Sequence, residues 1–218
     1  ITSTCSISGT DAAKYTLTQP TLTARSITAK PLTVTGAVAS NKIYNGNTAA
    51  TLTGGTLEGV ISPDVVNLTQ AGTFADKNVG TAKTVSVSGI SISGTDAGNY
   101  TYNTTASTTA NITARSLTVS ATGIDKVYNG NETATVTLSD NRVSGDVLTS
   151  SYTSAAFTDK NVGTGKAVTA NLASGDYSIT GTNALLSNYT LTTGDVTGNV
   201  GTITQKALTM SGLSVPSS

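Results

Sequence analysis

The sequence contains no histidine, and this absence removes most catalytic and metal-binding schemes at the outset. Ser-His-Asp triads and Cys-His pairs need an imidazole as general base, and many zinc centres use it as a ligand. No other arrangement of carboxylates, lysines or hydroxyls suggests a reaction. The sequence therefore predicts a protein that is not an enzyme and that holds no metal or cofactor.

Cysteine, charge and long apolar runs are also scarce. The single Cys5 excludes an internal disulfide framework. Charged residues make up 11% of the chain, and 12 basic residues balance 12 acidic ones, which predicts no nucleic-acid partner. No run approaches the roughly 18 apolar residues of a membrane span. We expect a protein that does not cross a membrane.

Threonine, serine, glycine and asparagine dominate instead, and they recur in blocks. Lys-Ile-Tyr-Asn-Gly-Asn at 42–47 returns as Lys-Val-Tyr-Asn-Gly-Asn at 126–131. Phe-Ala-Asp-Lys-Asn-Val-Gly-Thr at 74–81 returns at 157–164 with one change. Further blocks end at Tyr15, Tyr100 and Tyr189. A last block, which marks the start of each repeat, begins at Lys30, Arg115 and Lys206. The order of these blocks indicates tandem domains rather than a solenoid.

The register of the blocks divides the chain into four segments. Residues 30–114 and 115–205 are predicted to be complete repeats. Residues 1–29 match the end of a preceding repeat, and residues 206–218 match the start of a following one. These partial segments raise the hypothesis that subunits join head to tail by strand complementation.

Within each repeat the apolar residues alternate with polar ones. Val85 and Val87 alternate with serines, and the parity changes across Gly89, as it does across Gly175 in the second repeat. This pattern predicts short half-buried strands with a bulge or a turn at the glycine. We therefore expect an all-β fold of small antiparallel β-sandwiches, immunoglobulin-like in type, with a β-grasp-like sheet as the alternative.

The repeated blocks resemble the YDG and MBG repeats of very large bacterial surface proteins, including filamentous-haemagglutinin-like adhesins. The resemblance covers nearly the whole chain, although Asn45 and Asn129 stand where the family name implies Asp. It implies secretion, display on the bacterial cell surface and an architectural role without catalysis. The expected function is a structural stalk or fibre segment that spaces a distal binding region from the cell.

Two repeated tyrosine positions are expected to serve folding. Tyr44 and Tyr128 precede Asn-Gly, which favours a tight turn because both residues tolerate positive φ. A glycan-stacking site is the alternative. Tyr100 and Tyr189 resemble the tyrosine corner of sandwich folds, whose hydroxyl pins a connection.

Other residues are candidates for binding or crosslinking. Tyr102, Tyr152 and Tyr177 lack partners in the repeat pattern and are candidates for contact with glycans or host matrix. Lys42, Lys126, Asn99 and Asn188 are candidates for lysine–asparagine crosslinks of the kind found in pilin domains. Asp64, Asp96 and Asp146 do not cluster as calcium requires, so they are interpreted as turn caps.

The sequence thus leaves three functions open. The first is the adhesin stalk, whose partners are neighbouring repeats of the same chain. The second is a repeat that itself binds glycan or host matrix. The third is a subunit that assembles head to tail into a filament.

Overall fold

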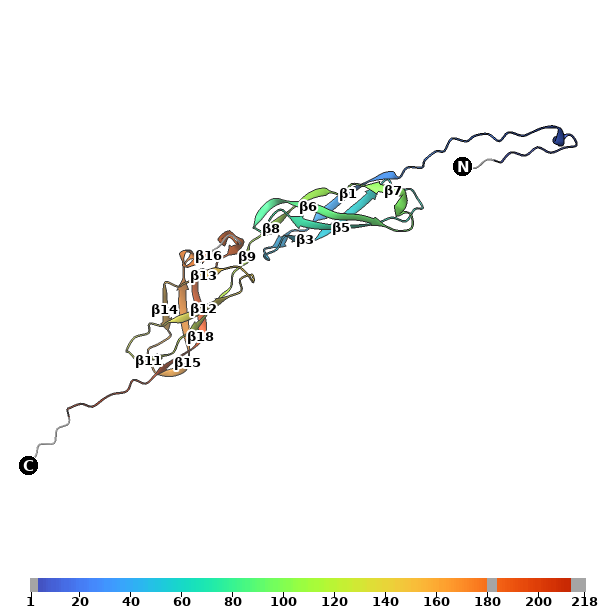
Figure 1. Ribbon diagram of the computed structural model, residues 1–218. Helices are drawn as coiled ribbons and strands as arrows, with labels where there is room; N and C mark the ends of the chain where they lie inside the picture. Colours follow the sequence, from blue (N-terminus) through green and yellow to red (C-terminus); the bar gives the residue numbers. More distant parts are fainter. Residues whose placement is uncertain (1–3, 180–183, 213–218) are drawn as a thin grey trace, which may run out of the picture.

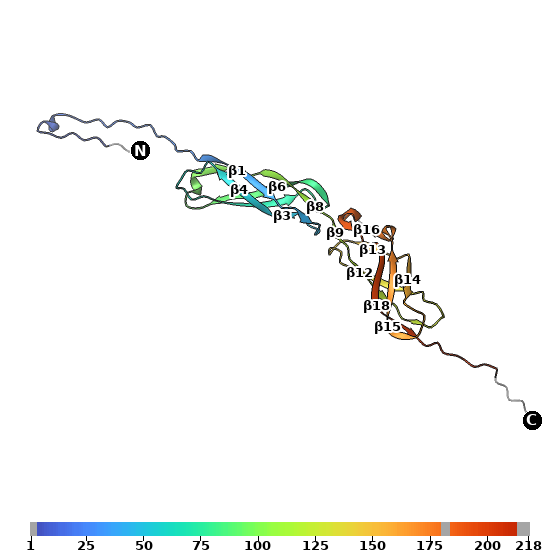
Figure 2. The ribbon, with the colours of Figure 1, turned by 180° about the vertical axis from the view of Figure 1, so that it is seen from behind.

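A computed structural model describes residues 4–179 and 184–212 and places the two repeats end to end (Figure 1). Residues 4–29 run outward from the far end of the first repeat and contain a short 3-10 helix, η1, at Ala12–Lys14. The chain after β18 leaves the opposite end of the second repeat, as the view from behind also shows (Figure 2). Residues 1–3, 180–183 and 213–218, which belong to three of the predicted segments, lie outside the described residues.

The regular structure of the described chain is nearly all strand, with only short 3-10 helices besides, which confirms the predicted all-β class. The elements of the first repeat are β1 (Lys30–Ala39), β2 (Lys42–Ile43), β3 (Ala49–Ala50), β4 (Leu52–Glu58), β5 (Asn67–Phe74), β6 (Gly80–Ser93), η2 (Ala97–Asn99), β7 (Tyr100–Tyr102) and β8 (Ala106–Thr113). Those of the second are β9 (Arg115–Ser116), β10 (Val119–Gly123), β11 (Lys126–Val127), β12 (Val136–Asp140), β13 (Leu148–Ser150), β14 (Ser154–Phe157), β15 (Gly163–Leu172), η3 (Ser174–Asp176), β16 (Tyr177–Ile179), η4 (Leu186–Asn188), β17 (Tyr189–Thr190) and β18 (Gly194–Thr204). None of the described helices is long and apolar enough for a membrane span.

The first repeat packs one sheet against another. Its sheets have the strand orders β4-β1-β7 and β2-β8-β6-β5-β3. Val34 from the first sheet meets Val87 and Ile90 from the second in a shared apolar cluster. The alternating valines therefore point into the core, as the period of two predicts.

The sheets are mixed rather than antiparallel throughout, because each repeat adds short parallel pairs at its edges. β1 runs parallel to β7 and β2 parallel to β8, and in the second repeat β9 runs parallel to β17 and β11 to β18. The long pairs, such as β6–β8 and β15–β18, are antiparallel. The chain enters each repeat at one end and leaves at the other, so its first and last strands run in the same direction.

The glycine-marked corners differ between the repeats. In the first, Gly89 has a φ of 59° inside β6, and the pairing with β5 shifts by one residue between Thr69 and Ala71. This is the predicted bulge, because one extra residue stands on the β6 side. In the second, η3 carries Gly175 between β15 and β16, so the same corner is a turn.

The buried core continues from one repeat into the other. A single cluster of buried side chains includes Phe74 and Val85 of the first repeat and Leu172 and Ile203 of the second. Tyr44 belongs to the same cluster and is fully buried. The two repeats therefore share a packed boundary.

Candidate functional site: the junction between the repeats

Tyr44 lies at the end of the first repeat and extends into the second. Its backbone N–H donates to the carbonyl of Thr113 at 2.8 Å, which fixes the residue beside the last strand of its own repeat. Its hydroxyl donates to the Asp146 carboxylate, 2.9 Å from Oδ2 and 3.2 Å from Oδ1. Its ring meets that of Tyr189 edge to face, with centroids 5.5 Å apart. Tyr44 thus connects the two repeats through both its ring and its hydroxyl.

The second repeat holds Asp146 in place with its own tyrosine. The Tyr189 hydroxyl accepts a hydrogen bond from the N–H of Val143 at 2.9 Å and donates to Asp146 Oδ2 at 2.6 Å. The N–H of Asp146 in turn donates to the carbonyl of Val143 at 3.1 Å. These contacts orient the carboxylate from within the second repeat.

The Asp146 carboxylate is almost fully removed from water. Its side chain is 2% exposed, and Lys77 of the first repeat lies 3.8 Å away through Nζ. Burial, assisted by the hydrogen bonds to Asp146, raises the pKa of Tyr44 and raises the pKa of Tyr189 to about 12. Both hydroxyls therefore remain neutral donors to the carboxylate at physiological pH.

A second contact crosses the junction beside this cluster. Asn188 is fully buried, donates from Nδ2 to Asn78 Oδ1 at 2.9 Å and accepts from the N–H of Val79 at 2.9 Å. The loop that presents Asn78 and Val79 is shaped by Asp76, which accepts from the N–H of Asn78 and from Lys83. The Lys83 ammonium holds the pKa of Asp76 below its usual range.

The backbone of Gly46 also lies close to the side chain of Val143 across the junction. A Cβ atom at Gly46 would lie 2.6 Å from Cγ1 of Val143, so a larger residue would force this side chain to shift. Gly46 also has a φ of 81°, the left-handed region that favours glycine. The Asn-Gly turn therefore serves the contact with the second repeat as well as its own backbone.

A comparison with protein-family models finds the YDG domain twice, at residues 28–110 and 113–198. The chain belongs to the YDG domain family. Neither the curated proteins nor the solved structures give a match. The junction is thus formed by two adjacent YDG repeats, the first supplying Tyr44 and Lys77 and the second Asp146, Tyr189 and Asn188.

The YDG turn differs from the predicted hairpin turn. Positive φ occurs at Gly46 and Gly130, at 81° and 85°, whereas Asn45 and Asn129 are not among the described residues with positive φ. The two asparagines instead accept hydrogen bonds from the N–H two residues on, at 3.4 and 3.3 Å. Glycine alone supplies the left-handed conformation.

In both YDG repeats the tyrosine hydroxyl pins a connection, as the comparison with the tyrosine corner predicts, but the backbone N–H that it accepts from lies 39 residues away for Tyr100 and 46 for Tyr189. The Tyr100 hydroxyl accepts from the N–H of Ile61 at 3.0 Å and donates to Asp64 at 2.6 Å, as Tyr189 does with Val143 and Asp146. The interpretation of Asp64 and Asp146 as turn caps therefore needs correction, because their carboxylates accept from tyrosine. In the described residues no group of three or more His, Cys, Asp or Glu is placed to hold a metal.

The three tyrosines considered for ligand binding are packed to different degrees. Tyr177 is 4% exposed and its hydroxyl donates to the carbonyl of Thr192, so its ring is not available to stack on a sugar. Tyr102 and Tyr152 are half-buried and pack against the hydrophobic clusters. The hydroxyl of Tyr152 also accepts from the N–H of Val136.

The crosslink candidates have other partners. The amine of Lys42 donates to Asn47 and to the carbonyl of Ala49, and that of Lys126 makes the corresponding bonds to Asn131 and Thr133. Asn188 is bonded to the loop at Asn78, and Asn99 is exposed. The structure therefore does not bring these lysines to Asn99 or Asn188.

Sequence reasoning missed the role of Asp146 and of the Lys77–Val79 loop. The available signal was the pair of related segments that end at Asp64 and Asp146, each of which begins with Ile or Val and Ser. These related segments indicate that both repeats contain the same local structure at this point. It does not reveal that one of them receives a tyrosine from its neighbour.

Proposed function

We propose that the chain is a spacer segment of an extracellular bacterial adhesin, in which YDG repeats are joined end to end with a fixed relative orientation. The observation that carries this proposal is the buried Asp146 carboxylate shared by Tyr44 and Tyr189. A buried carboxylate that loses one of its hydrogen-bonding partners is costly, so bending at this boundary is opposed. A stalk that holds a binding region away from a surface needs such boundaries.

Several other features support a spacer. The core cluster continues through the junction, so separating the repeats would expose apolar surface as well as the carboxylate. The long axes of the repeats follow one another in an extended arrangement (Figure 1). The resemblance of the repeated blocks to those of large surface adhesins supplies the extracellular setting.

A spacer of this kind requires that the two repeats keep a fixed relative orientation, and this orientation can be measured. Residual dipolar couplings measured on the whole chain are expected to fit one common alignment for both repeats. The Asp146→Ala chain is expected to need a separate alignment for each repeat, because Tyr44 loses its acceptor. Asp64→Ala is the matched control, since it removes the equivalent carboxylate from the opposite end of the first repeat. Independent alignment of the repeats in the unchanged chain would refute the proposal.

The cellular setting needs its own test. Antibodies raised against the two repeats are expected to label intact cells of the source bacterium. Labelling only after the cells are permeabilised would contradict the extracellular assignment and would leave the rigidity of the junction unaffected.

A further inference from the structure

At the two outer ends of the repeat pair, several residues are more accessible than the equivalent residues at the junction. Tyr44 is fully buried, whereas its counterpart Tyr128 is half-buried. Asn188 is fully buried, whereas its counterpart Asn99 is exposed. Val162, which corresponds to Val79, is 48% exposed. Each outer end therefore carries one half of the interface.

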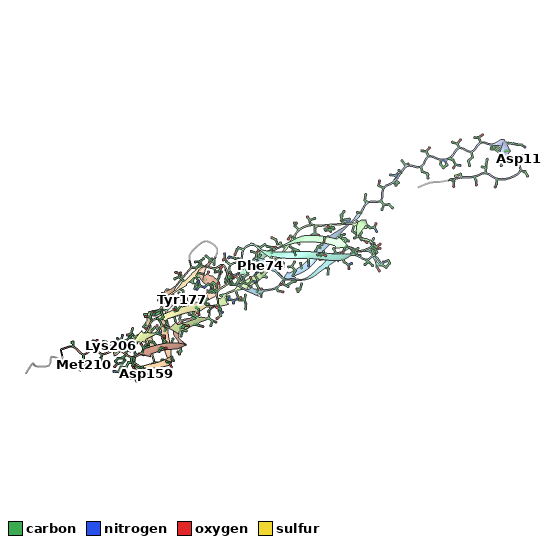
Figure 3. The ribbon with its side chains drawn as sticks, turned by 60° about the horizontal axis from the view of Figure 1, so that its bottom comes forward. Asp11, Phe74, Asp159, Tyr177, Lys206 and Met210 are labelled. Carbon is green, nitrogen blue, oxygen red and sulfur yellow. The ribbon has the colours of Figure 1, made fainter. Side chains whose placement is uncertain are left out.

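The end of the second repeat that carries Tyr128 has the same local hydrogen bonds as the end of the first repeat that carries Tyr44. The N–H of Tyr128 donates to Thr204 at 2.9 Å, as that of Tyr44 does to Thr113. Asp159 accepts from the N–H of Asn161 at 2.7 Å and from Lys166 at 2.6 Å, which gives the loop before Val162 the same internal bonds as the Asp76 loop. Figure 3 shows Asp159 at the end of the second repeat that lies away from Phe74 and the junction.

The opposite end of the pair, in the first repeat, carries a carboxylate that is placed to accept a hydrogen bond from another repeat's tyrosine. Asp64 receives the Tyr100 hydroxyl at 2.6 Å, and that hydroxyl accepts from the N–H of Ile61 at 3.0 Å. The same three groups in the second repeat form the site that receives Tyr44. Ile61, at the position of Val143, is 53% exposed. The acceptor therefore forms without a tyrosine from another repeat.

The Tyr128 end also has room for the side chain that the acceptor presents. Apart from Gly130 and its two chain neighbours, no described residue has an atom within 4 Å of a Cβ built at Gly130, whereas Val143 fills that place at Gly46. Beyond this end, Leu208 and Met210 are 92% and 86% exposed. Figure 3 shows Met210 on the segment that leaves the second repeat. Their spacing matches that of Leu117 and Val119, which begin the second repeat and are 0% and 5% exposed.

We propose that each outer end of the pair binds a further YDG repeat, with Tyr128 donating to that repeat's Asp146-type carboxylate and Asp64 accepting a preceding repeat's tyrosine. The inference rests on the proposed role of the Tyr44–Asp146 junction and extends it to a named partner for each end. A general apolar ligand would not require the paired hydroxyl and carboxylate. A repeat of the same family supplies both, together with the residue that packs on the glycine.

A three-repeat chain tests this partner directly. It is made by inserting a second copy of residues 115–205 between Gln205 and Lys206, so that the first copy of Tyr128 faces a repeat and the second copy does not. Tyr128→Phe in the first copy is expected to lower Tm by about 2 °C, the shift expected for loss of one buried hydrogen bond in a three-repeat chain that unfolds as one unit. The same substitution in the second copy is the matched control, and its expected shift is close to zero.

Two outcomes would overturn the inference. One is an equal shift for the two copies of Tyr128→Phe. The other is unfolding of the added repeat as a separate transition that neither substitution alters. Tyr44→Phe in the original chain separates this inference from the proposed function. If Tyr44→Phe lowers Tm but Tyr128→Phe changes it in neither copy, the Tyr44–Asp146 junction is supported and the binding of a further repeat at Tyr128 is rejected.

Discussion

Tyr44 and Tyr128 occupy the same position in two copies of one motif, but only Tyr44 is fully buried. Both are anchored to the last strand of their own repeat by nearly identical backbone hydrogen bonds. Both follow a lysine whose amine lies over a phenylalanine ring, at 5.2 and 5.4 Å from the centroid. The difference arises because a second repeat packs against Tyr44.

Each repeat forms its ends independently of its neighbour. The bonds that shape the Asp76 loop are repeated around Asp159, and the acceptor geometry at Asp146 is repeated at Asp64. Contact with a neighbour adds burial and one more donor to the carboxylate. Paired substitutions at equivalent positions can therefore separate the free energy of the junction from that of the fold.

The largest difference is expected between Asp146→Ala and Asp64→Ala. The first change leaves the buried hydroxyls of Tyr44 and Tyr189 without their acceptor, and should lower the free energy of unfolding by about 3 kcal/mol. The second change removes the acceptor of the Tyr100 hydroxyl alone, at a half-buried site, and should lower the free energy of unfolding by about 1 kcal/mol. Denaturant unfolding of both variants measures the two values. Equal losses would show that Tyr44 contributes nothing to the carboxylate's environment.

Asn188→Ala compared with Asn99→Ala examines the other half of the junction. Asn188 is buried and satisfies the N–H of Val79, so its loss should cost about 2 kcal/mol. Asn99 is exposed, and its change should stay within about 0.5 kcal/mol. Hydrogen exchange at the Val79 amide provides a local measurement, with faster exchange expected only in the Asn188→Ala chain. Unchanged protection at Val79 would contradict the assignment.

The sequence predicts much of each repeat because alternation is a local property. Val85 and Val87 are buried as their period requires, and Gly89 forms the bulge that the parity change indicates. Strand direction was predicted less well, since alternation is the same in parallel and antiparallel sheets. The edge pairs β1–β7 and β2–β8 depend on where the chain enters and leaves the repeat.

The junction could not be predicted because repetition makes its contacts ambiguous. Tyr44 has two equivalent carboxylates in the sequence, Asp64 in its own repeat and Asp146 in the next. Repeat spacing alone cannot choose between them. The structure selects Asp146, because Tyr44 lies at the end of its repeat opposite to Asp64.

The contact between Gly46 and the Val143 side chain is isolated by comparing Gly46→Ala with Gly130→Ala. Both glycines have positive φ, 81° and 85°, so the backbone strain of the new side chain is the same. Only at Gly46 does the added Cβ meet Val143, at 2.6 Å. Gly46→Ala should therefore be less stable than Gly130→Ala by about 1 kcal/mol, the lower range for overpacking. Parallel thermal unfolding measures the difference, and identical midpoints would show that the repeats do not touch there.

The smallest effect near neutral pH is expected from the tyrosines themselves. Folding raises the pKa of Tyr44 and raises that of Tyr189 to about 12, chiefly through burial. A raised pKa means that the folded state favours the neutral phenol. The resulting stabilisation is fully present below the unfolded value of about 10 and is lost as pH rises through the folded value.

Alkaline titration of the whole chain should therefore leave the junction intact up to pH about 10 and release it towards about 12. Absorbance of ionised tyrosine, recorded beside residual dipolar couplings, follows the phenols and the repeat orientation together. In the Tyr44→Phe chain the alkaline loss should be smaller, because one of the two coupled phenols is gone. Titration of every tyrosine near the ordinary value, with the common alignment kept, would mean that Asp146 and its tyrosines do not hold the repeats together.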